Sequence, residues 1–217
     1  MSSGRVQARA KPPERAWARV LREAGGSVHE QHLLRNTTLD VDPTDNRRID
    51  VLVTGLPLHS GRPLFCDATV RSPLTRNGQP HPRAATTSGA VLKKAVKDKE
   101  AKYSDVNASP LGELVVLGCE VGGRWHDTAE ELVRLLAKGK MKDVHPLLRR
   151  SSELAWVDRW WCVLDVAVQD AIAASLLAHT GKKLVLDNGD VDTPTLDEVL
   201  DGQRWASSWN GVSDDAL

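Results

Sequence analysis

Two aspartates interrupt neighbouring apolar runs of this chain. Asp50 lies within residues 47–53, and Asp67 lies within residues 64–70. Because aspartate is depleted in β-strands, its presence inside two strand-like runs is informative. Two carboxylates on adjacent strands are what a divalent metal ion needs, and such an ion supports phosphodiester cleavage at neutral pH. The pattern predicts a shared Mg²⁺ or Mn²⁺ site, with the two carboxylates no more than about 8 Å apart.

Alternation along the second run divides its side chains between two faces of a half-buried strand. Asp67 shares its face with Phe65 and Thr69. The opposite face is apolar and comprises Leu64, Cys66, Ala68 and Val70. Cys66 is therefore expected to be a core residue rather than a nucleophile, although it adjoins Asp67 in the sequence.

A lysine-rich helix is predicted to follow, over about residues 84–102. One stripe of this helix comprises Leu92, Val96, Lys99 and Tyr103. A lysine in an apolar stripe is costly to bury without a partner, so Lys99 is a candidate to reach the carboxylates and stabilise charge on a scissile phosphate. The alternative is that Lys99 snorkels from the edge of the stripe to solvent. The first interpretation predicts that Lys99 faces the acids while Lys93 and Lys97 are exposed.

Turn residues and apolar periodicity predict the elements that position these side chains. We expect a helix from Glu14, strands at 28–34, 48–54, 63–71 and 114–117, a helix opened by a capping box at Asp127, and an apolar helix at about 152–179. This order predicts an α/β fold with a mixed sheet flanked by helices. We expect a disordered basic lead at 1–13, one domain at 14–180, and an acidic, largely disordered tail at 181–217.

Composition excludes several classes of protein. The chain has 217 residues, is 41% hydrophobic and 27% charged, and carries a formal net charge of zero, as expected of a globular domain. No apolar stretch is long enough for a membrane span, and three distant cysteines favour a reducing compartment. Any contact with nucleic acid must therefore depend on local charge. Residues 71–102 contain eight basic side chains against Asp98 and Glu100, a plausible surface for a phosphate backbone.

Three segments carry a resemblance to a known family. Residues 48–50, 66–74 and 99–103, in this order and spacing, resemble the restriction-like endonuclease domain of site-specific non-LTR retrotransposon reverse transcriptases. That domain is a branch of the PD-(D/E)XK nuclease superfamily. The resemblance covers about residues 14–180 and implies an αβββαβ restriction-endonuclease-like core followed by the long C-terminal helix. It also implies an intracellular protein, nuclear if derived from a retroelement.

The resemblance assigns roles to individual residues. It implies that Asp50, Asp67 and Lys99 are catalytic. Glu23, on the first helix, would join Asp50 and Asp67 as a ligand of Mg²⁺ or Mn²⁺, and Glu120 is a further possible ligand. The residues expected to bind DNA are Arg48, Arg71, Lys97 and Tyr103, and Tyr103 is also expected to anchor the end of its helix.

The chain departs from the family pattern at two positions. Ile49 stands where proline usually precedes the first aspartate, and Thr69 stands where the superfamily usually has lysine. Lys99 would replace that lysine from the following helix. Two functions follow as alternatives. One is a metal-dependent DNA endonuclease derived from a retroelement, and the other is a non-catalytic domain that keeps the nuclease fold to bind nucleic acid or protein.

Overall fold

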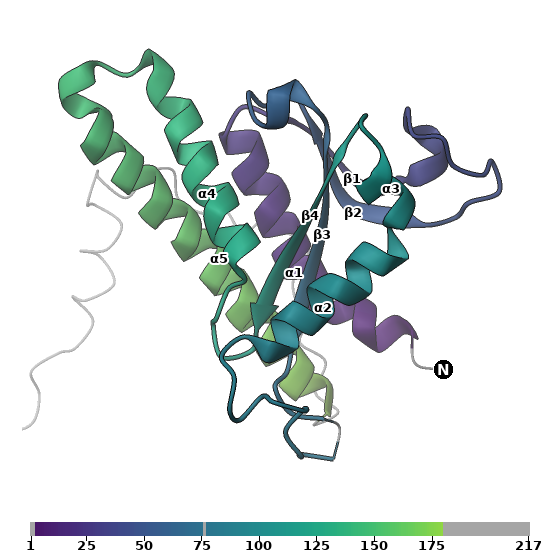
Figure 1. Cartoon of the computed structure of the whole chain (residues 1–217). Coiled ribbons are helices and arrows are strands. Elements are labelled where there is room, and N and C mark those ends of the chain that lie inside the picture. The colour runs from purple at the N-terminus through teal and green to yellow at the C-terminus, as the bar shows by residue number, and fades with distance from the viewer. Residues whose placement is uncertain (1–2, 76, 180–217) are drawn as a thin grey trace, which may run out of the picture. The chain divides into compact units, whose positions relative to one another are not determined.

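The structure is a computed structural model that describes residues 3–75 and 77–179. Its helices and strands follow one another along the chain as shown in Figure 1. They are α1 (Ser3–Glu23), β1 (Ser27–Leu33), β2 (Arg48–Thr54), β3 (Leu64–Arg71), α2 (Ala90–Lys102), α3 (Ser104–Ala108), β4 (Glu113–Glu120), α4 (Asp127–Lys140) and α5 (Arg149–His179). Short 3-10 turns lie at Leu34–Asn36, His59–Gly61, Met141–Asp143 and Pro146–Leu148.

The four strands form one mixed sheet in the order β1-β2-β3-β4. β1 pairs with β2 and β2 pairs with β3 in antiparallel fashion, whereas β3 and β4 are parallel. Parallel neighbours need a crossover connection, which α2 and α3 provide here. The predicted α/β class, with a mixed sheet flanked by helices and a long C-terminal helix, is confirmed.

Helices cover both faces of the sheet (Figure 1). α1 and α4 pack on one face, and α5 packs against both of these helices. Trp17 of α1 and Trp160 of α5 are fully buried in this larger core, together with the face of β3 that carries Cys66. α2 and α3 cover the other face, where Phe65 and Tyr103 belong to a second, smaller core. β3 is therefore enclosed on both sides over most of its length. This differs from the half-buried strand that its alternation predicted.

The bounds of β1, β2 and β3 lie within one residue of those expected, whereas β4 continues three residues beyond the expected 114–117 and several helix ends differ. α1 begins at Ser3 rather than at Glu14, so the part of the basic lead that is described is helical, with Pro12 and Pro13 inside the helix. Proline usually marks the first turn of a helix, which is why the start was expected after this pair. α2 begins at Ala90 rather than at residue 84, because Gly89 precedes it in the left-handed conformation with φ of 68°.

The start of α4 is capped in a different way from the one predicted. His126, not Asp127, is the N-cap residue, and its imidazole accepts a hydrogen bond from the Thr128 amide. None of the helices in residues 3–179 combines the length and the apolar character that crossing a membrane requires. The predicted acidic tail lies outside the described residues.

Candidate active site

Asp50 and Asp67 lie on adjacent strands, as predicted. Val51 of β2 is paired with Cys66 of β3, so one further step along the antiparallel register sets the two aspartates opposite each other. The regular pairing stops there, and Asp50 Oδ2 accepts a hydrogen bond of 2.9 Å from the Ala68 amide. The side chain of Asp50 thus substitutes for a backbone partner, which fixes its carboxylate at the junction of the two strands.

Lys99 brings a cation to this junction. Its Nζ lies 2.5 Å from Oδ1 of Asp67, and the Asp67 side chain is only 2% exposed. Lys93 and Lys97 are exposed on the other side of α2, so the predicted orientation of the helix is confirmed. The contact is an ion pair without hydrogen-bond alignment, since Oδ1 of Asp67 has no hydrogen-bond partner among the described residues.

Burial and like charge perturb the protonation of Asp50. Burial, the negative charge of Asp67 and the negative charge of Glu14 together raise the Asp50 pKa from 3.8 to about 7. The hydrogen bond from Ala68 and the nearby Lys99 charge oppose this rise without cancelling it. Ionisation of the Asp50 carboxyl is therefore unfavourable in this site, a condition that a bound divalent cation would relieve.

Glu14, on α1, is the third acid near this pair, and the sequence analysis did not select it. The Gln31 side-chain amide donates to Glu14 Oε2 at 2.8 Å and, more weakly, to Asp50 Oδ1 at 3.4 Å. Burial raises the pKa of Glu14, the hydrogen bond from Gln31 opposes the rise, and the charge of Asp67 adds to it. Gln31 has a positive φ of 51°, an uncommon conformation for a residue other than glycine.

The position of Glu14 in the sequence offered a signal. It is the first acidic residue of the apolar helical pattern, and its place on the first helix matches the place at which an extra acid was expected. Glu23 lies on the same helix, so the sequence alone does not say which of the two faces the strands.

Glu23 lies away from Asp50 and Asp67, so the expectation that it shares a metal ion with them is wrong. Its carboxylate accepts hydrogen bonds from Arg159 at 2.9 and 3.0 Å, from Trp160 Nε1 at 3.0 Å and from Arg19 at 3.0 Å. Glu23 is nine residues beyond Glu14, which is about 13.5 Å further along the helix axis. Burial alone would raise the Glu23 pKa, but the hydrogen bonds from Arg159, Arg19 and Trp160 lower it overall. Glu23 therefore links α1 to α5 through hydrogen bonds with Arg159 and Trp160.

Glu120 also lies away from the two aspartates. It is paired in the sheet with Arg71, four residues along β3 from Asp67, which corresponds to about 13 Å. Its Oε2 lies 3.3 Å from Arg124 Nη1. This geometry does not support a role for Glu120 as a ligand of the same ion.

Tyr103 is enclosed in protein, so the prediction that it contacts substrate is wrong. Its side chain is fully buried, and its hydroxyl donates to the Arg48 carbonyl at 2.8 Å and accepts from Lys102 at 2.6 Å. Burial, followed by the charges of Asp67 and Asp50, raises the Tyr103 pKa. Tyr103 thus anchors the C-terminal end of α2 to β2 and holds Lys99 over the sheet.

Three other residues expected to bind substrate are at or near the surface. Arg48 is exposed at the first position of β2, two residues before Asp50 in the chain. Arg71 and Lys97 line a cavity between α2 and the C-terminal end of β3, which is the part of the strand that follows Asp67. The DNA-contacting roles of these three residues stay predictions.

The donor set fits Mg²⁺ or Mn²⁺ in one respect and falls short in another. Mg²⁺ is commonly held by one or two carboxylates, with water and substrate phosphate supplying the other ligands, and Asp50 and Asp67 provide such a pair. Asp67 Oδ1 is buried without a hydrogen-bond partner, but the Lys99 ammonium lies 2.5 Å from it, so a metal ion at this atom would have to displace that ammonium. Within residues 3–75 and 77–179, however, no group of three or more His, Cys, Asp or Glu side chains has the arrangement of a metal site.

No family model matches this chain, and no curated protein matches its sequence, so the interpretation of this site depends on its own geometry.

Proposed function

We propose that this protein is a metal-dependent DNA endonuclease derived from a retroelement, in which Asp50, Asp67 and Lys99 are the catalytic residues. The observation that carries the proposal is the meeting of Asp67 with Lys99, 2.5 Å apart, at the point where Asp50 binds the Ala68 amide. Two acids and a lysine from three separate elements converge where the sequence pattern predicted that they would.

The element order supports the same proposal. A helix, three strands, a helix and a further strand follow one another from α1 to β4, with the first three strands antiparallel and the last parallel. This is the order expected of the αβββαβ restriction-endonuclease-like core. A fold permits many functions, so the assignment depends on the site more than on the order of the elements.

Each residue has a task in phosphodiester hydrolysis. A Mg²⁺ or Mn²⁺ ion held by Asp50 and Asp67 would lower the pKa of a bound water and stabilise charge on the phosphate. Lys99 supplies an ammonium for a non-bridging phosphate oxygen, where negative charge develops as the bond breaks. Gln31 and the Ala68 amide hold the Asp50 carboxylate in place before substrate arrives.

The second candidate function is a non-catalytic domain that binds nucleic acid or protein. The observation that favours it is the lack of a third metal ligand within the described residues, together with the ion pair that Lys99 forms with Asp67. The two candidates differ in one measurable property, since only the first requires that phosphodiester bonds are broken.

Cleavage of supercoiled plasmid DNA tests the proposal. With Mg²⁺ or Mn²⁺ the protein is expected to produce nicked circles, and Asp67→Asn is expected to slow nicking about a thousandfold, because several kcal/mol of charge stabilisation are lost. Asp158→Asn, which changes an exposed acid on α5, is the matched control and should cut at the original rate. A protein that leaves the plasmid intact with both metals, or an Asp67→Asn variant that cuts normally, would contradict the proposal.

A further inference from the structure

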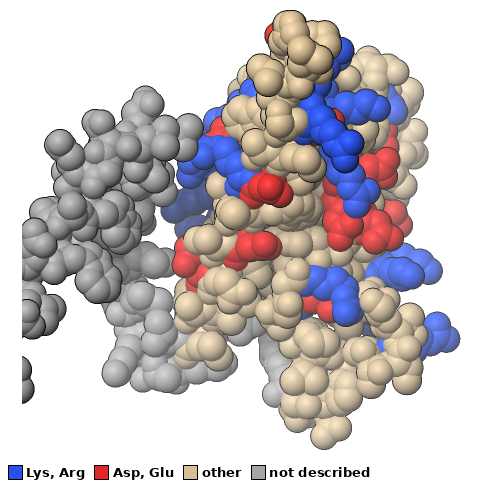
Figure 2. Space-filling model, turned by 90° about the vertical axis from the view of Figure 1, so that its left-hand side faces the viewer, with Lys and Arg blue, Asp and Glu red and all other residues tan. Residues whose placement is uncertain are grey.

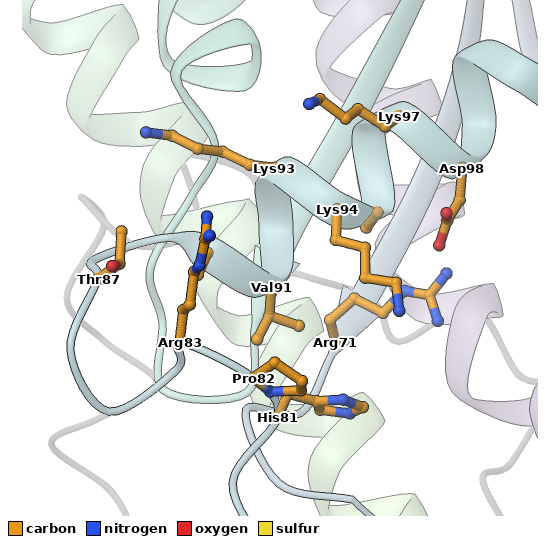
Figure 3. Close-up of a pocket in the computed structure, with 12 residues that line it drawn as sticks. Arg71, His81, Pro82, Arg83, Thr87, Val91, Lys93, Lys94, Lys97 and Asp98 are labelled. Carbon is orange, nitrogen blue, oxygen red and sulfur yellow. The ribbon is translucent and has the colours of Figure 1, made fainter.

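A basic pocket lies next to the candidate active site. It is a cavity of about 450 Å³ between the end of β3, the loop that follows it and the N-terminal half of α2 (Figure 3). Its charged lining comprises Arg71, Arg83, Lys93, Lys94, Lys97 and Asp98. We propose that this basic pocket binds a backbone phosphate, with its sugar, of the DNA strand that is cut, some nucleotides away from the scissile bond. This inference rests on the proposed function.

Charge is the first argument for an anionic ligand. Five cationic side chains line the basic pocket against the single carboxylate of Asp98. None of these five forms an ion pair with an acidic residue of the described chain. In Figure 3 the side-chain ends of Lys94 and Arg71 lie near one another in the view, with the Asp98 carboxylate beside them. Neighbouring cations repel each other, so an anion bound close to both would be stabilised by both.

Arg71 provides the second argument. Its Nε is buried and has no hydrogen-bond partner among the described residues, although a buried donor of this kind normally has one. Arginine presents several N–H groups in a planar fork that matches the oxygens of a phosphate. Because Nε itself is covered by protein atoms, a phosphate in the basic pocket would bind the outer N–H groups of the Arg71 guanidinium, which lines that pocket.

The lining of the basic pocket favours a nucleotide unit over a bare ion. Its volume lies within the range of small-ligand sites, about 300–1,000 Å³, and exceeds what one phosphate fills. Pro82, Ala90 and Val91 add apolar surface suited to a sugar. The N-terminal end of α2 borders the cavity and carries no acid in its first turn, so the positive end of the helix dipole is not neutralised there.

The same two elements carry the basic pocket and the candidate active site, which fixes their spacing. Asp67 and Arg71 are four residues apart on β3, or about 13 Å along the strand. Each nucleotide advances a DNA strand by about 3.4 Å along the duplex axis, so the separation corresponds to about four nucleotides. One continuous strand can thus occupy both sites, and the basic pocket would position it for cleavage.

The side of the molecule formed by α4 and α5 carries both signs of charge. Figure 2 shows the side of α4 and α5, where Lys and Arg are interspersed with Asp and Glu. Lys138 and Lys142 are exposed in that region, at the end of α4 and in the turn that follows it. They offer a matched control for charge changes in the basic pocket.

Binding of a short fluorescent DNA duplex, measured by anisotropy without divalent metal, tests the inference. The double variant Lys94→Glu/Lys97→Glu is expected to weaken binding at least about tenfold at low salt and to reduce the slope of log K against log salt by about 1–2, since each lost phosphate contact contributes about 0.9. Lys138→Glu/Lys142→Glu makes the same change of charge and should bind like the original protein. Arg83→Glu, in the loop, is a second pocket variant that does not alter a helix.

The outcomes separate this inference from the proposed function. Equal binding by the pocket variants and the Lys138→Glu/Lys142→Glu control would overturn the inference, even if the protein nicks plasmid. Displacement of the duplex by ATP as effectively as by unlabelled DNA would also overturn it, because the basic pocket would then be a site for free nucleotides. Selective loss of binding in the pocket variants would support it, even if the original protein proved unable to cut. In a protein that cuts, the pocket variants should raise KM and leave kcat nearly unchanged.

Discussion

Replacing Lys99 by Met is expected to lower the free energy of unfolding by about 3 kcal/mol in the absence of divalent metal. The Lys99 ammonium lies 2.5 Å from Asp67 Oδ1, and the Asp67 side chain is almost completely buried. Removing one partner of such a pair leaves the other charge buried without compensation, and this is the costly case. Lys102, the next cation on the same helix, donates to the Tyr103 hydroxyl, so it does not replace Lys99 in the present arrangement.

Urea unfolding at neutral pH, with and without Mg²⁺, measures this effect. Mg²⁺ is expected to restore part of the stability lost in Lys99→Met, because the ion binds the carboxylates that the ammonium had balanced. Lys93→Met, an exposed position on α2, is the control and should change little. The same Lys99→Met protein should nick DNA at least about a hundredfold more slowly. A Lys99→Met variant as stable as the control would show that the ion pair does not balance a buried charge.

Asp50→Asn is expected to stabilise the metal-free protein at pH 8 by up to about 4 kcal/mol. The native Asp50 pKa is about 7, against the ordinary value of 3.8, mainly because of burial and then because of the charge of Asp67. Between these two pH values the native protein retains a proton that the unfolded chain has released. The stability of the original protein therefore falls as pH rises from 3.8 to 7 and levels off above that.

Asparagine carries no charge, so the variant lacks this loss of stability. It also keeps a side-chain oxygen that can accept the hydrogen bond from the Ala68 amide. Unfolding measured at pH 5 and pH 8 should show a larger difference between the two proteins at pH 8 than at pH 5. Equal differences at the two pH values would contradict the raised pKa. Because Asp50→Asn also removes one carboxylate of the proposed metal site, the more stable protein should be the inactive one.

Much of the fold could be predicted from the sequence, because strand signals are local. Alternation of apolar residues placed β2 at residues 48–54 and β3 within 63–71, as the structure has them within one residue. The positions at which helices begin could not be predicted as well. Pro12 and Pro13 continue α1, whereas a single left-handed glycine, Gly89, sets the start of α2. The enclosure of β3 on both faces depends on α1 and α2, which no local pattern in the strand reveals.

The part of the candidate site that follows from the periodic pattern of apolar residues in strands and helices could be predicted. Two acids in apolar strands and one lysine in an apolar stripe identified Asp50, Asp67 and Lys99, which the structure brings together. Which of Glu14 and Glu23 faces the two aspartates depends on how α1 is rotated about its axis against the sheet, and the sequence does not show this. Tyr103 is expected from the sequence to anchor its helix, but its partner, the Arg48 carbonyl, is known only from the structure. The contacts of Gln31 with Glu14 and Asp50 depend on a left-handed backbone conformation that the sequence does not predict.

Calorimetric titration of Mn²⁺ into the metal-free protein tests most directly whether Asp50 and Asp67 form a divalent-metal site. At pH 6.5, in buffers of different ionisation enthalpy, we expect one ion to bind and to release a proton, because Asp50 is largely protonated below its pKa of about 7 and must ionise to act as a ligand. Asp67→Asn should abolish this binding, whereas Glu23→Gln, which alters contacts within α1 and between α1 and α5, should preserve it. Binding of Mn²⁺ by Asp67→Asn as strong as by the original protein, or no binding by the original protein, would contradict the account.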